Sequence, residues 1–299
     1  MPKHKEQFQG NRPARRPVPL QLRLIRFVFS TLGGLFPRLV GRQAFNLWFR
    51  TRRFPESAAG KRAARNARHE VMPVNSVPVA ISRWGNSGPR ILFIHGWSGR
   101  GNQVAAFLQP LLAAGCQVVA VDGPGHGDTP GDKTNILECA RVVQAANKEY
   151  GPFHGAITHS FGGMVLAYAL QHGMRVNRAV CISAPADVAF LLENFAQTLC
   201  MHPKVVSELD RLLDLRFEST FREQVSTVNN VRNLDVPALV IHDEQDSSVP
   251  IEQGRRIAEA WPNARLMQTS GLGHGRILRD AEVVAAAVAF IADDIDTAG

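Results

Sequence analysis

The stretch Gly155-Ala156-Ile157-Thr158-His159-Ser160-Phe161-Gly162-Gly163 decides the fold of this chain. An apolar run ends at Ser160, and two glycines follow at the start of a helical pattern. A sharp strand-to-helix turn of this kind exposes the serine side chain at the carboxyl edge of a sheet, and it needs small neighbours where the backbone folds back. The Phe161 amide would then lie at a helix N-terminus, where it can stabilise an oxyanion.

Short apolar runs alternate with helical stretches on both sides of this turn. Their Val, Ile and Leu content is typical of strands buried on both faces. The pattern predicts strands over 77–84, 91–95, 117–122, 155–159, 179–183, 238–242 and 265–269, and helices over 102–114, 135–150, 161–172, 250–260 and 280–295. This alternation indicates an α/β fold with a mostly parallel sheet and helices on both faces.

Four further motifs lie at or just after the ends of predicted strands. One is His95-Gly96-Trp97-Ser98-Gly99, and the next is the glycine-rich turn over 121–127. The stretch over 240–250 contains several acidic residues and ends in Val249-Pro250, and His274 stands between glycines in the segment 270–275. Of the ten histidines, His274 alone lies beyond residue 246.

These segments together resemble the α/β-hydrolase superfamily, whose nucleophile motif is G-x-S-x-G. The resemblance implies an eight-stranded type of sheet and a serine hydrolase in which Ser160 is the nucleophile, Asp246 the orienting acid and His274 the base, in the family's order along the chain. It also implies that the amides of Trp97 and Phe161 form the oxyanion hole. Such a mechanism requires no cofactor and no metal.

Two positions leave questions within this resemblance. Thr158 stands where the first glycine of the motif is usual, which strains the turn. Alignment on Val249-Pro250 selects Asp246 as the acid, while Asp243 is a competitor and Asp187, used in some branches of the superfamily, is a weaker one.

Charge divides the chain into an extension and a body. Residues 1–70 carry 16 Lys and Arg against 3 Asp and Glu, a balance of +13, and the remaining residues carry 34 − 16 = 18 basic against 26 − 3 = 23 acidic side chains, a balance of −5. We predict a basic helical extension over 1–70, a hydrolase core over 71–186 and 233–299, and a helical cap over 187–232. Because the body is acidic, we expect no nucleic-acid partner.

The extension has two interpretations. Arginines mix with Leu, Ile, Val and Phe between residues 20 and 50, a pattern typical of a helix on an anionic membrane surface. Alternatively these helices pack against the body or a second copy of the chain, which would make a homo-oligomer, and a disordered basic tail precedes them. The longest uncharged piece, 27–37, is too short to span a bilayer. The four cysteines show neither metal-ligand nor disulfide spacing, and the start of the sequence shows no secretory signal. Both features favour a cytoplasmic protein. If the first interpretation holds, it contacts the inner membrane face peripherally.

The expected reaction is hydrolysis of a carboxylic ester or thioester of a small molecule through an acyl-enzyme. A serine at position 160 disfavours the haloalkane dehalogenase and epoxide hydrolase chemistries, which use an aspartate there. The apolar residues of the predicted cap, 187–232, indicate an apolar acyl site. The alternatives are acyl transfer, carbon-carbon bond hydrolysis or peptide cleavage with the same three residues, and a non-catalytic protein of this fold that binds lipid or another partner through its basic extension.

Overall fold

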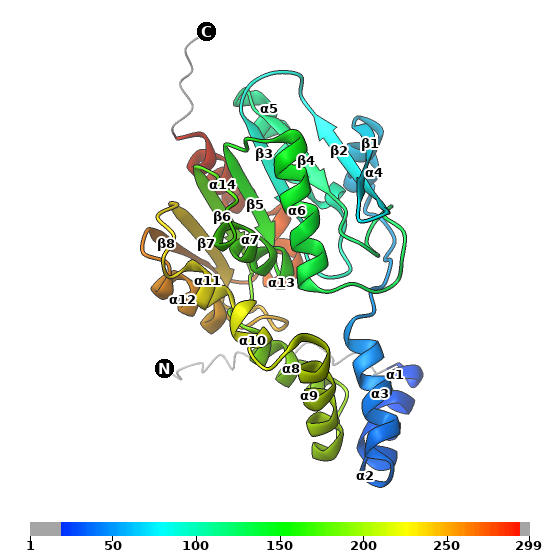
Figure 1. Cartoon of the computed structure of the whole chain (residues 1–299). Coiled ribbons are helices and arrows are strands. Elements are labelled where there is room, and N and C mark those ends of the chain that lie inside the picture. The colour runs from blue at the N-terminus through cyan, green and yellow to red at the C-terminus, as the bar shows by residue number, and fades with distance from the viewer. Residues whose placement is uncertain (1–18, 294–299) are drawn as a thin grey trace, which may run out of the picture.

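The computed structural model describes residues 19–293 and is built on one eight-stranded sheet (Figure 1). The strand order is β1-β2-β4-β3-β5-β6-β7-β8, with β2 antiparallel to β1 and β4 and all other neighbours parallel. The strands are β1 (Arg68–Val74), β2 (Val77–Trp84), β3 (Arg90–Ile94), β4 (Gln117–Val121), β5 (Gly155–His159), β6 (Arg178–Ile182), β7 (Ala238–Asp243) and β8 (Ala264–Thr269). The predicted fold class is confirmed.

Helices cover both faces of the sheet because alternate strand residues point to opposite sides. On β3, Ile91 and Phe93 join the core under α4, α5 and α14, whereas Leu92 and Ile94 join the core under α6, α7 and α12. These helices are α4 (Ala58–Arg65), α5 (Ala105–Ala113, preceded by the 3-10 turn Gly101–Val104), α6 (Ile136–Tyr150), α7 (Phe161–Gln171), α12 (Ile251–Ala260) and α14 (Ala281–Ala292). The helix predicted over 280–295 ends at Ala292, and its last two positions lie outside the described residues.

The edge strand β1 is absent from the expectations drawn from sequence. Its residues are mostly exposed and it contains Pro73, so it lacks the apolar run that marks the central strands. It pairs with β2 through the two-residue turn Asn75-Ser76, in which both residues have positive φ, 47° and 66°. Such φ values at both central positions are typical of a tight hairpin.

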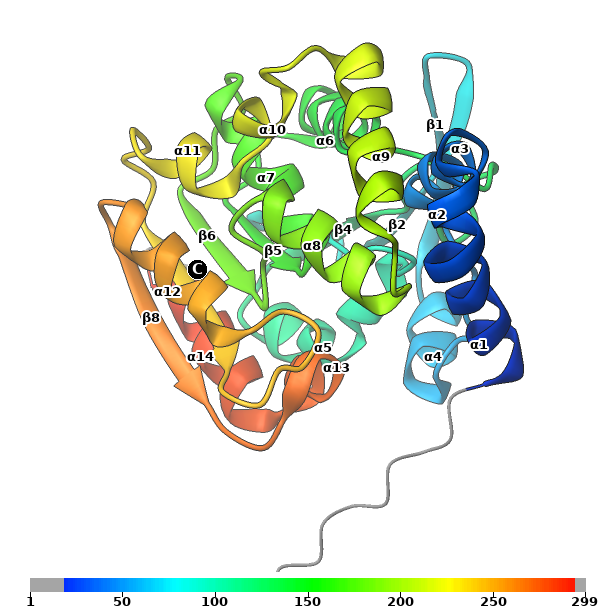
Figure 2. The same ribbon diagram turned by 90° about the horizontal axis from the view of Figure 1, so that it is seen from below.

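The segment between β6 and β7 forms only helices within its described length, as its pattern predicted. They are α8 (Val188–Thr198), α9 (Pro203–Phe217), α10 (Phe221–Gln224) and α11 (Thr227–Val231). In Figure 2 this group lies over the end of the sheet at which β5 meets α7.

The extension folds into helices that pack against α9. They are α1 (Leu20–Phe27), the π-helical turn Val28–Leu32, α2 (Gly33–Leu35) and α3 (Pro37–Trp48), and Figure 2 shows them alongside α9. Glycines permit the close approach: a Cβ atom on Gly33 would lie 2.5 Å from the Val205 side chain, and one on Gly41 would collide with Glu208. The basic tail predicted before these helices lies outside the described residues.

The chain from residue 49 to residue 56 ties the extension to the core. Thr51 donates from its amide to the Asp132 carbonyl at 2.9 Å and from its hydroxyl to the Gly125 carbonyl at 2.8 Å. The Arg53 guanidinium donates to three backbone carbonyls between 127 and 131, and Arg100 pairs with Glu56. The extension is therefore held by the same loops that border the carboxyl end of the sheet.

Several large apolar side chains of α1 to α3 are exposed. Those with exposed fractions of 37% to 77% are Leu20, Leu24, Phe27, Leu32, Leu35, Phe36 and Leu39. Within residues 19–293, no helix is both long enough and apolar enough to cross a bilayer.

Candidate active site

Ser160 occupies a strained turn between β5 and α7. Its φ of 52° and ψ of −123° lie outside the regions that a side chain normally allows, and positive φ at a non-glycine residue costs on the order of 1–3 kcal/mol. The turn is possible because its neighbours are small: a Cβ atom on Gly162 would collide with the Ile94 carbonyl, and one on Gly96 would lie 3.0 Å from the Ser160 Cβ. Strain of this kind at a serine is a feature of nucleophile turns.

Thr158 fits the turn without displacing it. The side chain is fully buried, and its hydroxyl donates to the Val180 carbonyl on β6 at 3.1 Å. Gly163 is required by Ala184 rather than by Thr158, because a Cβ atom on Gly163 would lie 2.5 Å from the Ala184 side chain but at an ordinary 3.5 Å from the Thr158 hydroxyl. The threonine is therefore accommodated where the family motif usually has glycine.

His274 and Asp246 meet at the carboxyl ends of β8 and β7. His274 stands in the short helix α13 (Gly273–Arg276), and its Nδ1 lies 2.7 Å from Asp246 Oδ2. The other carboxylate oxygen of Asp246 accepts hydrogen bonds from the amides of Ser248 and Val249, both at 2.9 Å. Burial alone raises the pKa of Asp246, but the hydrogen bonds from His274 and these amides outweigh it and hold the pKa below its ordinary value. In the neutral imidazole, an ionised Asp246 favours the proton on Nδ1, so that Nε2 carries the lone pair.

The two competing carboxylates have other partners. Asp243 binds the loop that carries His274: it accepts from the amides of Leu272 and Gly273 at 3.0 and 2.9 Å and from the Thr269 hydroxyl at 2.8 Å. Asp187 caps α8 and forms an ion pair with Arg256 at 2.6 Å. Neither makes a recorded hydrogen bond to the His274 imidazole, although Asp243 supports the backbone just before it.

His159 connects the serine turn to the His274 loop. Its Nε2 donates to the His274 carbonyl oxygen at 2.9 Å, and the two rings lie 4.8 Å apart. Burial, with a smaller contribution from the adjacent His274, lowers the pKa of His159 to about 3. The Ser160 hydroxyl itself makes no hydrogen bond within the part of the chain that is described. The structure thus brings His274 and Asp246 together directly, and it links the His274 loop to the residue next to Ser160.

The loop over 95–99 carries the second predicted oxyanion donor. Neither the Trp97 amide nor the Phe161 amide donates a recorded hydrogen bond within residues 19–293, and their rings pack edge to face at 5.0 Å. His95 holds this loop, since its Nδ1 donates to the Gly96 carbonyl at 2.7 Å and its Nε2 accepts from the Gly123 amide at 3.1 Å. Burial lowers the pKa of His95 to about 4, so the imidazole stays neutral.

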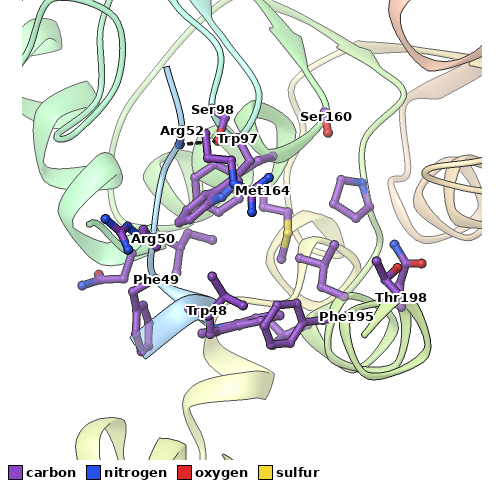
Figure 3. A pocket seen from close by; sticks show the side chains of 18 of the residues that line it. Trp48, Phe49, Arg50, Arg52, Trp97, Ser98, Ser160, Met164, Phe195 and Thr198 are labelled. Atoms are coloured by element: carbon purple, nitrogen blue, oxygen red, sulfur yellow. Dashed lines mark hydrogen bonds between the residues drawn. The ribbon is translucent and has the colours of Figure 1, made fainter. Parts of the chain in front are cut away.

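A pocket of about 500 Å³ opens in front of Ser160 (Figure 3). Its lining is predominantly apolar and aromatic, which suits an organic ligand. The predicted cap contributes Leu191, Phe195 and Leu199, and the core contributes Trp97, Ser98, Asn135, Ile136, Phe161 and Met164. The extension contributes the opposite wall with Leu22, Leu47, Trp48, Phe49, Arg50 and Arg52.

A protein-family model described as the alpha/beta hydrolase family matches residues 91–287, more than half of the chain. The chain belongs to the alpha/beta hydrolase family. This hydrolase is 25% identical over 256 residues to a non-heme chloroperoxidase of Kitasatospora aureofaciens, covering 67% of the chain and 90% of that protein. It is 26% identical over 236 residues to a pimeloyl-[acyl-carrier protein] methyl ester esterase of Neisseria meningitidis, covering 66% and 74%. Among solved structures, alpha/beta hydrolase domain-containing protein 10 from mouse superposes with a TM-score of 0.63 at 16% identity, covering 77% of this chain and 99% of that one.

Sequence reasoning missed the part that the extension plays in this hydrolase. The apolar pattern over 20–48 predicted helices but carried no signal for their partner, and the pocket wall depends on where residues 47–52 meet the core loops. The role of Asp243 was also missed. Its signal was present as a second carboxylate at the end of a predicted strand, opposite the glycine-rich segment 270–275.

Proposed function

We propose that this hydrolase cleaves a carboxylic ester or thioester through an acyl-enzyme on Ser160. The observation that carries the proposal is the position of Ser160: it stands in a strained turn and lines an apolar pocket, to which Trp97 and Phe161 also contribute. The 2.7 Å contact between His274 and Asp246, linked through His159 to the same turn, adds support. A curated relative named as a methyl ester esterase agrees with this class of substrate.

The proposed reaction has two halves. In the first, His274 Nε2 takes the proton of the Ser160 hydroxyl as the oxygen attacks the substrate carbonyl, and Asp246 stabilises the imidazolium that forms. The amides of Trp97 and Phe161 donate to the oxyanion, each contributing on the order of 3 kcal/mol. The tetrahedral intermediate expels the alcohol or thiol, which receives the proton from His274. In the second half, water attacks the acyl-enzyme by the same route, the acid leaves, and Ser160 regains its proton.

Loop closure is part of this proposal, because the Ser160 hydroxyl and His274 must come within hydrogen-bond reach during the reaction. Catalytic hydrogen bonds are often long or poorly aligned before substrate binds. The glycines at 271 and 273, both with positive φ, give the His274 loop the freedom to adjust.

Hydrolysis of p-nitrophenyl esters of graded chain length tests this proposal. We expect a burst of p-nitrophenol equal to the enzyme concentration, followed by a slower steady state. Rates should rise with acyl chain length, because a longer chain fills more of the apolar pocket. Ser160→Ala should abolish both phases, while Ser207→Ala, on the exposed surface of α9 and outside the pocket lining, serves as the matched control. A folded Ser160→Ala protein with undiminished turnover would show that Ser160 is not the nucleophile.

The alternative partner of the extension is an anionic membrane, and we propose contact through residues 20–50. Support comes from the exposed apolar side chains of α1 to α3 and from the exposed cations Arg23, Arg38 and Arg42 on the same helices. Sedimentation with vesicles of phosphatidylglycerol should retain the protein, and Leu35→Asp with Leu39→Asp should release it. Absence of binding together with a dimer by light scattering would instead assign these side chains to contact with a second copy of the chain.

A further inference from the structure

The charged side chains among the described residues that line the pocket in front of Ser160 are all positive. Of the described residues that line it, Arg50 and Arg52 are the charged ones, and both belong to the extension. No carboxylate lines the pocket within the described part of the chain. A ligand that fills this space therefore meets apolar side chains and two positive charges.

The two arginines differ in their partners. Arg50 Nε lies 3.7 Å from Asp132, so its charge is partly compensated. The Arg52 guanidinium has no recorded hydrogen bond or ion pair within residues 19–293. Figure 3 shows the Arg52 side chain reaching over the pocket beside Trp97. Arg52 is thus an exposed cation on the wall of an apolar pocket, without an acidic partner among the described residues.

The backbone of Arg52 is fixed even though its guanidinium is unpaired. Its amide donates to the Ser98 hydroxyl at 3.0 Å, and Thr51 beside it is buried and bonded to the loop over 125–132. Ser98 directly follows Trp97, the proposed oxyanion residue. The base of the Arg52 side chain is therefore held at a set position relative to the reaction centre, as recognition of a substrate group requires.

We propose that Arg52 binds an anionic group of the substrate, a carboxylate or a phosphate, while the rest of the substrate fills the apolar pocket. This inference rests on the proposed function and names its substrate class: an amphipathic ester or thioester with one negative group remote from the scissile bond. A guanidinium suits either anion because its donors match two oxygens at once. Arg50, partly paired with Asp132, adds long-range attraction at the same wall.

Two pairs of substrates test which side of the scissile bond carries the anionic group. In the first pair the charge lies on the acyl side: the monomethyl ester of a straight-chain dicarboxylic acid is compared with the methyl ester of the monocarboxylic acid of equal length. In the second pair it lies on the leaving group: a 2-phosphoethyl ester is compared with the 2-hydroxyethyl ester of the same acid. Within the wild type we expect the anionic member of one pair to have the higher kcat/KM.

Variants at position 52 then test the assignment. Arg52→Gln should lower kcat/KM for the preferred anionic substrate about tenfold and leave its neutral partner within about twofold, since loss of a charge-assisted hydrogen bond has an effect of about one factor of ten. Arg52→Lys, which keeps the charge without the fork, should retain an intermediate preference. Arg23→Gln, an equally basic position of the extension outside the pocket lining, is the matched control.

Binding to the Ser160→Ala protein keeps this test independent of turnover. Trp48 and Trp97 line the pocket, so their fluorescence reports ligand entry. We expect the anionic ester to bind about tenfold more tightly than its neutral partner, and Arg52→Gln to remove the difference. Equal affinities for both members of both pairs, or a preference unchanged by Arg52→Gln, would overturn the inference. If wild-type Ser160 fails to turn over any ester while this binding preference persists, the proposed reaction fails and the anion site stands.

Discussion

Replacing Asp243 by asparagine should disable the loop that carries His274 without touching Ser160. Asp243 Oδ1 accepts from the amides of Gln245 and Gly273 at 3.0 and 2.9 Å, and Oδ2 accepts from the Leu272 amide and the Thr269 hydroxyl at 3.0 and 2.8 Å. Asparagine keeps one acceptor oxygen and turns the other into a donor. Two hydrogen bonds to a charged group are lost. The new side-chain NH2 group then faces a backbone N–H, which is also a donor.

The expected cost follows from those contacts. A hydrogen bond to a charged group contributes about 1.5–3 kcal/mol, so we expect Asp243→Asn to lower the free energy of unfolding by about 3–5 kcal/mol. Burial raises the pKa of Asp243, but the donors from the loop outweigh it and hold the pKa below its ordinary value. Asp243 is thus ionised at neutral pH, and its contribution is lost only as the pH falls through that lowered pKa.

Urea unfolding and ester turnover measure the two consequences. Besides the shift in stability, kcat should fall about 100-fold, because displacement of a catalytic group by about 1 Å has an effect of that size. Asp187→Asn is the control, since that carboxylate caps α8 and pairs with Arg256 instead. An Asp243→Asn protein with wild-type kcat and stability would refute the assigned role.

Two further predictions concern pH and packing. Burial lowers the pKa of His95 to about 4 and that of His159 to about 3. Below about pH 6.5 these histidines take up a proton in the unfolded chain but not in the folded protein. The free energy of unfolding should therefore fall by about 1.4 kcal/mol per pH unit for each residue as the pH decreases from 6.5 toward 4. Burial raises the pKa of Asp122 to about 6, which offsets part of this loss of stability. Urea midpoints should still decline from pH 7 to pH 5, and less steeply in His159→Gln. A midpoint that does not change with pH would contradict the assignment of both histidines as neutral. Gly41→Ala should push α3 away from Glu208, cost about 1–3 kcal/mol and raise KM for long-chain esters, whereas Leu39→Ala on the exposed side should do neither. Equal KM values for both variants would show that the position of α3 does not affect the pocket.

The central part of the fold could be predicted because its signals are local. The central strands β3, β4, β5 and β7 are apolar runs that end at a motif, and the glycines at 96, 162 and 163 stand where a Cβ atom would meet backbone or a packed side chain. The proposed site residues could be named for the same reason, since each follows a strand at the same edge of the sheet. The strand β1 carried no such signal, because an exposed edge strand needs no apolar run.

The wall of the pocket could not be predicted because it depends on contacts between distant segments. Trp48 packs against Phe195 with ring centroids 5.2 Å apart, and Arg26 donates to the Thr198 carbonyl at 2.9 Å. Nothing in the pattern over 20–48 distinguishes such packing from a free amphipathic surface. The role of Asp243 could not be predicted either, since only the turn after β7 directs Asp246 to the imidazole and Asp243 to the loop backbone.

Labelling with a fluorophosphonate probe, followed by peptide mass mapping, tests the nucleophile directly. We expect one adduct, on Ser160, in the wild-type protein, none in Ser160→Ala, and much slower labelling in His274→Gln, which lacks the proposed base. An adduct on another serine, or no adduct in the folded wild-type protein, would contradict the proposal that Ser160 is the nucleophile.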